Sequence, residues 1–327
     1  MVAINANRST FLHRKSRIIF KWKKLKSIFA ACFSFSSLKK NILFIINPVS
    51  GGKSKFKFPS LAEQYLNKNI FSARYLYSES IGHAHQLALE NTRNDTDIVV
   101  AVGGDGTINE IASVLVNTTN CIGIIPCGSG NGLARALGIP LNHKQAVKRL
   151  NQLNFIKIDS GLFNNKSFFN MAGIGFDAHI SKCFADNVDR GLGGYVRETF
   201  KEIGRYRSQN YKIYIDGKLY EREAFMISIA NSSQYGNNAH ISPFASVSDQ
   251  LLDVCIVKPF PICYFPVMGF QMFNKTIHRS RFVEIIRGGN VQIIRDEEGP
   301  VHLDGEPCFM GLELNIKVKP LSLNILT

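Results

Sequence analysis

The stretch VVAVGGDGTINEI, residues 99–111, contains the pattern that decides the fold. A run of apolar residues ends in three glycines, and apolar residues then recur at Ile108 and Ile111, at the spacing of a helix. A strand, a glycine turn and a helix in this order are typical of a parallel sheet with crossover helices. The glycines let a polyanion approach the backbone, and the start of the helix offers N–H groups to it. The stretch therefore predicts a phosphate-binding turn.

Asp105 is the unusual member of this turn, because a carboxylate beside phosphates is expected either to share a magnesium ion with them or to order the loop. Thr107 is expected to cap the helix. The alternative is an ordinary tight turn with an aspartate that suits its backbone conformation. The candidates for nucleotide binding in this segment are Gly103, Gly104, Asp105, Gly106, Thr107, Asn109 and Glu110.

Two further strands end in turns of the same kind. The apolar run 121–126 is followed by Gly128, Ser129 and Asn131, and the run 41–46 is followed by Asn47, Pro48, Val49, Ser50 and Gly51. The second of these turns leads into Gly-Lys-Ser, residues 52–54, like a P-loop. Asn47 stands where a P-loop begins with glycine, and the proline after it has no N–H to donate, so the turn must have another shape.

The alternation of strand, glycine turn and helix predicts an α/β domain over residues 41–155, with ligands at the carboxyl ends of its strands. From residue 156 to residue 327, short alternating runs predict an antiparallel, β-rich domain. Its hairpin turns are expected at Asp216-Gly217 and Gly289-Asn290, and one helical insertion around residues 194–206. Two domains also suit a chain of 327 residues, since single cores stop growing at about 250–300 residues.

Residues 1–40 form a basic arm with ten Lys or Arg and no Asp or Glu, in a chain whose net charge is +14. The arm also contains aromatic and aliphatic residues, which suits an anionic membrane surface; a nucleic-acid-binding arm and a disordered start are the alternatives. Its apolar part, SIFAACFSFSSL, is shorter than the ~20 residues that span a bilayer. Seven cysteines without a C-x-x-C pair indicate reduced thiols in a cytoplasmic protein.

The three turns together, N-P-x-S-G, G-G-D-G-T and P-x-G-S-x-N, resemble the diacylglycerol kinase catalytic domain. That family includes bacterial soluble lipid kinases and the sphingosine and ceramide kinases, and the resemblance covers roughly residues 41–327. It implies a Rossmann-like domain that binds ATP and Mg²⁺ and a C-terminal β-sandwich domain for the lipid. The active site would lie in the cleft between them, and the end of the chain would return to the first domain.

The resemblance also implies roles for residues outside the three turns. The family has a D-G-E near its C-terminus, matched here by residues 304–306, in which Asp304 or Glu306 would be the general base. Ser78 matches a nucleotide-contacting position. The segment SVSDQLLDV resembles a metal-binding segment in which the Asp249 side chain and the carbonyls of Ser246 and Leu251 would hold a structural Mg²⁺. The glycine usual after that aspartate is Gln250 in this chain.

These features predict an ATP-dependent kinase that transfers the γ-phosphoryl group to a hydroxyl of a membrane lipid, such as diacylglycerol or a sphingoid base. An NAD kinase-like enzyme, which also has G-G-D-G-T before a β-rich domain, is one alternative. A non-catalytic basic adaptor of membranes or nucleic acids is another. We expect a cytoplasmic enzyme of phospholipid biosynthesis that binds the membrane peripherally through its basic arm and does not bind nucleic acid. An exposed strand edge in the second half would allow two copies to pair.

Overall fold

The structure is a computed structural model that describes residues 39–52, 54–92, 95–185, 197 and 199–327. Residues 1–39 and 40–327 are separate units. Residues 1–38 of the predicted basic arm, Lys53, and residues 194–196 and 198 of the predicted helical insertion lie outside the described residues, while residues 199–202 of that insertion are helical.

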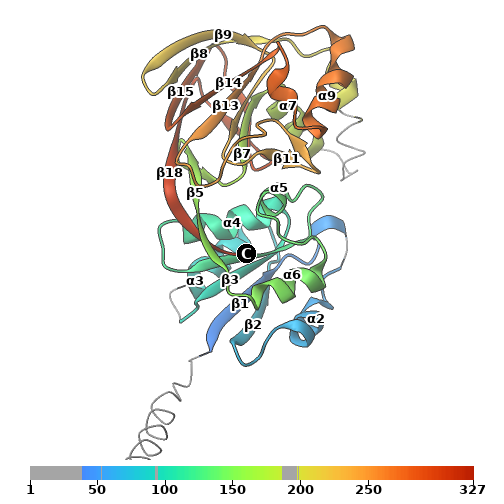
Figure 1. Cartoon of the computed structure of the whole chain (residues 1–327), viewed down its shortest axis with the longest axis vertical. Coiled ribbons are helices and arrows are strands. Elements are labelled where there is room, and N and C mark those ends of the chain that lie inside the picture. Colours follow the sequence, from blue (N-terminus) through green and yellow to red (C-terminus); the bar gives the residue numbers. More distant parts are fainter. Residues whose placement is uncertain (1–38, 53, 93–94, 186–196, 198) are drawn as a thin grey trace, which may run out of the picture. The chain divides into compact units, whose positions relative to one another are not determined.

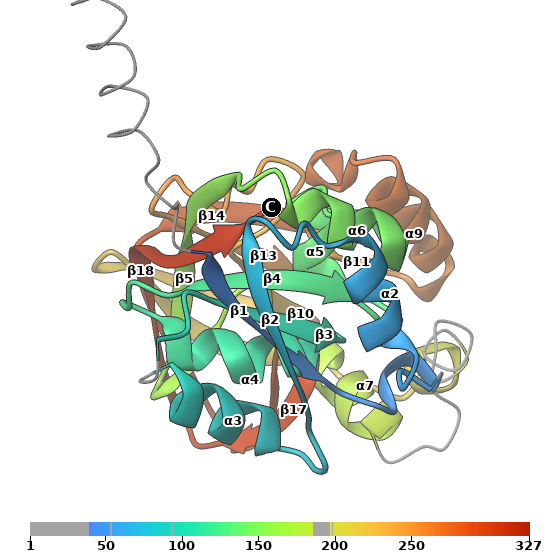
Figure 2. The same cartoon turned by 90° about the horizontal axis from the view of Figure 1, so that it is seen from below.

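The first part of residues 40–327 is a parallel sheet with helices on both faces (Figures 1 and 2). Its strands lie in the order β2 (Phe71–Tyr77), β1 (Lys40–Ile46), β3 (Ile98–Gly103) and β4 (Cys121–Pro126). The helices are α2 (Phe58–Tyr65), α3 (His83–Asn91), α4 (Asp105–Leu115), α5 (Gly132–Ala136) and α6 (His143–Leu150).

Alternate strand residues pack against opposite helix layers, as the two-residue period of a strand requires. One core joins the apolar sides of α3 and α4 to residues such as Leu43 and Val99. The other joins α2 and α6 to residues such as Phe44 and Val100. The inner strands β3 and β4 are apolar throughout because both faces of the sheet are buried there, which confirms the predicted parallel α/β architecture.

The second part is antiparallel and contains two sheets that pack face to face. The first sheet continues the parallel strands through β18 (Glu313–Leu326), β15 (Asn290–Arg295), β8 (Gln209–Ile215) and β9 (Lys218–Ala224), while β5 (Phe155–Phe163) pairs with β18 and with β6 (Lys166–Phe168). The second sheet has the order β14 (Val283–Gly288), β13 (Leu252–Val257), β10 (Met226–Ala230), β7 (Met171–Gly175), β16 (Gly299–Leu303) and β17 (Glu306–Met310). Side chains such as Ile213 and Ile229 fill the space between the sheets.

The remaining elements of the second part and of the first turn are short strands, helices and 3-10 turns outside these two sheets. They are the ribbon β11 (Gln234–Gly236) and β12 (Ala239–His240), the helices α7 (Phe176–Ala185) and α9 (Phe265–Phe273), and the 3-10 turns η1 (Ser50–Gly52), η2 (Ile262–Tyr264) and η3 (Ile277–Arg279). Strand β18 joins the two parts, because it pairs antiparallel with β15 and β5 and its last residues run parallel to β4. None of the described helices combines the length and apolar character that crossing a membrane requires.

Three local predictions were wrong. Thr107 does not cap α4: the N-cap is Gly104, and the helix begins earlier, at Asp105. Gly289-Asn290 is not a hairpin turn, because β14 and β15 belong to different sheets and Gly289 lies where the chain crosses between them. The helices α7 and α9 were not predicted in the second half, which was interpreted as strands with one helical insertion.

Candidate active site

The three glycine turns predicted from the sequence meet at the carboxyl ends of β1, β3 and β4. A Cβ atom added to Gly51 would lie 2.1 Å from the carbonyl oxygen of Cys127, and one added to Gly128 would lie 2.7 Å from the Cα of Gly104. The backbones of the turns therefore touch at these points, and any larger residue would separate them. Glycine is required here by the close approach of three loops to one another.

The first turn, which follows β1, is tied by side chains to the second turn, which follows β3. The Nδ2 atom of Asn47 donates to Oγ1 of Thr107 at 3.1 Å, while Oδ1 of Asn47 accepts from the N–H of Val49 at 3.2 Å. The ammonium of Lys55 is buried beneath the turn and donates to the carbonyl of Ser50 at 2.8 Å. Lys55 was not among the predicted site residues, because nothing in the run Lys-Ser-Lys, residues 53–55, indicates that this cation is buried.

Asp105 joins the second turn to the third turn, which follows β4. Its carboxylate accepts from the backbone N–H groups of Asn131 and Gly132 at 2.8 and 2.9 Å, and so holds the start of α5. Burial, and secondarily the charge of Asp304, raises the pKa of Asp105 to about 6. These contacts correspond to the second of its two expected roles, that of ordering the loops.

Several other predicted nucleotide-contacting residues have partners inside the protein. Asn131 closes its own turn, since its side chain accepts from the N–H of Gly128 and donates to the carbonyl of the same residue. Glu110 accepts from the N–H groups of Gly82 and His85 at the start of α3. Ser78 follows β2, where its N–H bonds to the carbonyl of Ile46, beside the first turn. Ser129 and Val49 are exposed, and Pro48 is partly buried.

The D-G-E segment reaches this group of turns from the far end of the sequence. Asp304 and Gly305 form the hairpin turn between β16 and β17, with φ values of 50° and 89°. The Asp304 carboxylate accepts from Asn109 Nδ2 at 2.7 Å and from the N–H groups of Asn170 and Met171 at 2.8 and 3.0 Å.

A further N–H group, that of Phe169, donates to the same carboxylate at 3.0 Å. Burial raises the pKa of Asp304, and these donors partly oppose the rise by stabilising the ionised form. Asp304 thus connects helix α4, which carries Asn109, to the backbone that precedes β7.

Glu306, in contrast, is exposed and lies over the first turn of α4. A Cβ on Gly106 would lie 2.5 Å from Oε1 of Glu306, so the carboxylate covers the glycine that follows Asp105. The last acid of the D-G-E segment therefore faces the G-G-D-G-T turn. Of the two candidate bases, Glu306 is the one that solvent reaches.

A buried pair lies directly behind this segment. Nε2 of His302 lies 2.6 Å from Oδ2 of Asp177, the second residue of α7, and both side chains are buried. Gly173 leaves room for the pair, because a Cβ there would lie 2.1 Å from His302 Nε2. Helix α7 is thereby fastened to β16 two residues before Asp304.

The predicted metal segment has a different partner. The Asp249 carboxylate forms an ion pair with Nη2 of Arg287 and accepts from the N–H of Leu251 at 3.2 Å. Arg287 also contacts the buried Asp253, with 3.1 Å between Nε and Oδ1. Gln250 takes the positive φ, 66°, that suits the glycine usual in the family. The arrangement does not fit a cation held by Ser246, Asp249 and Leu251, because Arg287 supplies positive charge there.

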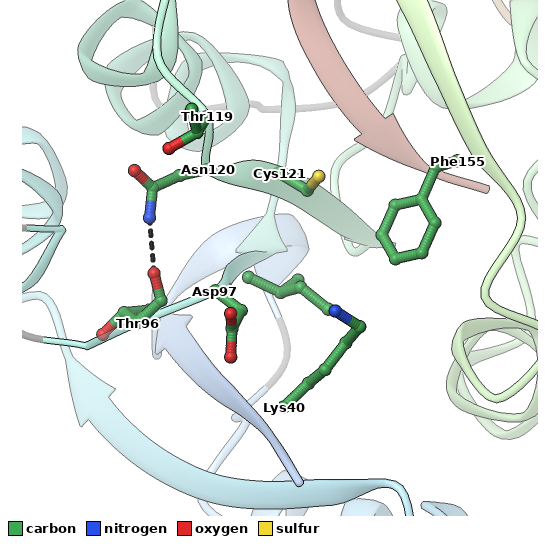
Figure 3. Close-up of a pocket in the computed structure, with 8 residues that line it drawn as sticks. Lys40, Thr96, Asp97, Thr119, Asn120, Cys121 and Phe155 are labelled. Carbon is green, nitrogen blue, oxygen red and sulfur yellow. Dashed lines mark hydrogen bonds between the residues drawn. The ribbon is translucent and has the colours of Figure 1, made fainter. Parts of the chain in front are cut away.

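A pocket of about 210 Å³ lies at the opposite end of the parallel sheet, at the amino ends of its strands (Figure 3). It is lined by Lys40, Thr96, Asp97, Ile98, Thr119, Asn120, Cys121 and Phe155. Its polar groups bond within the protein: Asn120 Nδ2 donates to the Thr96 carbonyl, and Asp97 accepts from the N–H of Asn41. The pocket shares no residue with the three turns and is not part of the candidate site.

Comparison with known proteins assigns the family. Residues 41–163 match the diacylglycerol kinase catalytic domain, and residues 170–327 match the YegS C-terminal NAD kinase beta sandwich-like domain. A protein of Chromohalobacter salexigens named probable lipid kinase YegS-like is 30% identical over 238 residues, which are 70% of this chain and 75% of that protein. This chain belongs to the diacylglycerol kinase catalytic domain family. The relatives bearing lipid kinase names make it a member of a phosphotransferase family, as predicted.

Two further proteins match most of this chain, one in sequence and one in fold. The diacylglycerol kinase of Bacillus subtilis is 26% identical over 273 residues, covering 82% of this chain and 90% of that protein. A solved diacylglycerol kinase of Bacillus anthracis has a TM-score of 0.66 and 21% identity over 88% of this chain and 96% of its own. The predicted fold class, a parallel α/β domain followed by an antiparallel β-sandwich, is confirmed.

Proposed function

We propose that this member of the lipid kinase family transfers the γ-phosphoryl group of ATP to a hydroxyl of a membrane lipid. The observation that carries the proposal is the position of Glu306, whose carboxylate covers Gly106 in the first turn of α4. The triphosphate would lie along the touching turns of Gly51, Gly104 and Gly128, where the N-terminus of α4 favours negative charge.

Glu306 would act as the general base. The lipid oxygen would attack the γ-phosphorus, the bond from that phosphorus to the β,γ-bridging oxygen would break, and ADP would leave. The proton of the lipid hydroxyl would pass to the Glu306 carboxylate. Asp304 is less suited to this step, because four N–H donors already surround its oxygens. It would position the D-G-E turn against α4.

Asp105 would position the loops, since it bonds two N–H groups of the third turn. Mg²⁺ that accompanies ATP would offset charge on the phosphates. Among the described residues, no group of three or more His, Cys, Asp or Glu side chains is placed to hold a metal ion. The protein's own part is therefore to present backbone N–H groups, one base and a fixed geometry.

The test is an assay of purified full-length protein with γ-labelled ATP, a total lipid extract and, separately, NAD. We expect label in a lipid product and none in NADP. Glu306→Gln should lower the rate of lipid labelling by about 10²–10⁴-fold, while Glu313→Gln, which changes an exposed glutamate on β18, should leave it unchanged. Label in NADP alone would favour the NAD kinase alternative. Binding of vesicles without any transfer would favour the adaptor.

A further inference from the structure

Helix α9 exposes an apolar face. Val267, Phe270 and Phe273 recur at helical spacing and are 41%, 69% and 55% exposed, while Met268 and Met272 on the inner side pack into a core with Met171 and Ile241. An amphipathic surface helix would carry polar residues on its outer face. Here the helix is apolar on both sides, which leaves the outer side chains without a described partner.

Exposed apolar residues near both ends of α9 extend this face. Phe200 meets Phe265 edge to face with 5.5 Å between ring centroids, and Ile262 in η2 is 58% exposed. Beyond the other end, Phe244 contacts His278 at 4.9 Å. We call the set Phe200, Phe244, Ile262, Val267, Phe270 and Phe273 the α9 surface. Large exposed apolar surfaces of this kind mark contacts with proteins or membranes.

The charges around the α9 surface distinguish between those partners. Residues 258–283 contain four Lys or Arg and no Asp or Glu. Lys275, Arg279 and Arg281 are exposed and form no ion pair within the described part of the chain, whereas Lys258 pairs with Glu284 at 3.0 Å. Aromatic side chains rimmed by unpaired cations suit the interface of an anionic bilayer, in which rings enter the acyl region and cations meet headgroups.

The α9 surface is also connected to the candidate site. Phe176 and Ile180 of α7 share one core cluster with Phe265 of α9. Helix α7 in turn holds β16 through the Asp177–His302 pair, next to the D-G-E turn. Both helices lie on the β-rich part (Figure 1). A bilayer bound at the α9 surface would therefore be connected to the candidate site through the contacts of α7.

We propose that the α9 surface docks this protein on anionic lipid bilayers. The proposal rests on the proposed lipid kinase function, since it names where the membrane that holds the substrate would bind. It differs from the predicted role of the basic arm, which lies outside the described residues.

A tryptophan probe tests the contact directly, because the chain has one tryptophan, Trp22. Full-length Trp22→Phe/Phe270→Trp would be mixed with vesicles of equimolar phosphatidylglycerol and phosphatidylcholine that carry brominated acyl chains. We expect the emission of the tryptophan introduced at position 270 to shift to the blue and to be quenched. The matched control is Trp22→Phe/Phe309→Trp, at a similarly exposed position on β17, which should not be quenched.

Binding measurements complete the test. Phe270→Ser/Phe273→Ser should lower the vesicle partition coefficient by about tenfold for each ring removed. If the protein sediments with vesicles but the tryptophan at position 270 is not quenched, the proposal is overturned and the binding is assigned to the basic arm. A blue shift without vesicles that disappears on dilution would also overturn it, since the surface would then join copies of the chain. Quenching without phosphorylated lipid would refute the kinase function alone.

Discussion

Replacing Asp304 with asparagine tests whether this carboxylate anchors the site. Backbone N–H groups of Phe169, Asn170 and Met171 donate to its oxygens, and the Asn109 amide does so from α4. Asparagine keeps one oxygen and turns an NH₂ group toward the donors of the other. Each buried donor left without an acceptor costs about 1–3 kcal/mol. The substitution also removes a buried negative charge, which offsets part of the cost of the unsatisfied donors. We therefore expect a net loss of about 2 kcal/mol in the free energy of unfolding.

The assay is urea unfolding of Asp304→Asn beside Glu306→Gln, with lipid phosphorylation measured on both. Glu306→Gln should change stability by less than about 0.5 kcal/mol, because the side chain is exposed, and should lower turnover by about 10²–10⁴-fold. Asp304→Asn should lose both stability and activity. The reasoning is refuted if Asp304→Asn is as stable as the wild type, or if Glu306→Gln retains full turnover while Asp304→Asn has none.

Three further changes have defined outcomes. Gly128→Ala should abolish ATP binding in calorimetry, because its Cβ would lie 2.7 Å from the facing turn, whereas Gly311→Ala, with open space around it, should bind normally. The folded-state pKa of Asp105, about 6, lies above the ordinary value, so its ionisation disfavours the fold. The stability of the wild type relative to Asp105→Asn should therefore fall by about 2 kcal/mol as the pH rises from about 4 to about 7, and a difference independent of pH would contradict this. Nucleotide-free wild-type protein should have the same melting temperature in EDTA and in Mg²⁺. Arg287→Ala should have a lower melting temperature that Mg²⁺ raises, because Asp249 loses the cation with which it pairs. A wild-type melting temperature that depends on Mg²⁺ would contradict this.

The parallel sheet and its turns were predictable because their signals are local. Strands β3 and β4 are apolar throughout, β1 is apolar from Ile42 onward, and each of the three turns has glycines where loops touch, at Gly51, Gly104 and Gly128. Side chains that join distant segments were not predictable. Nothing near Asp304 in the sequence indicates that the backbone of residues 169–171 will donate to it.

The predictions that failed have equally local reasons. Helix α9, FPVMGFQMF, has Gln271 as its single polar side chain, so it lacks the polar face that distinguishes a surface helix from a buried strand. Gly289 begins a chain crossing between two sheets, and such a crossing needs the same turn residues as a hairpin. The metal segment stays a prediction, and its sequence pattern could not show the ion pair that Asp249 forms with Arg287, 38 residues further on.

The central claim is that one triphosphate lies across the three turns with Glu306 facing its end. A crystal structure of the full chain with a non-hydrolysable ATP analogue tests it most directly. We expect the phosphates against the backbone of Gly51, Gly104 and Gly128, and the γ-phosphate on the side of Gly106 that Glu306 covers. An analogue bound elsewhere, or with its γ-phosphate directed away from Glu306, would contradict the claim.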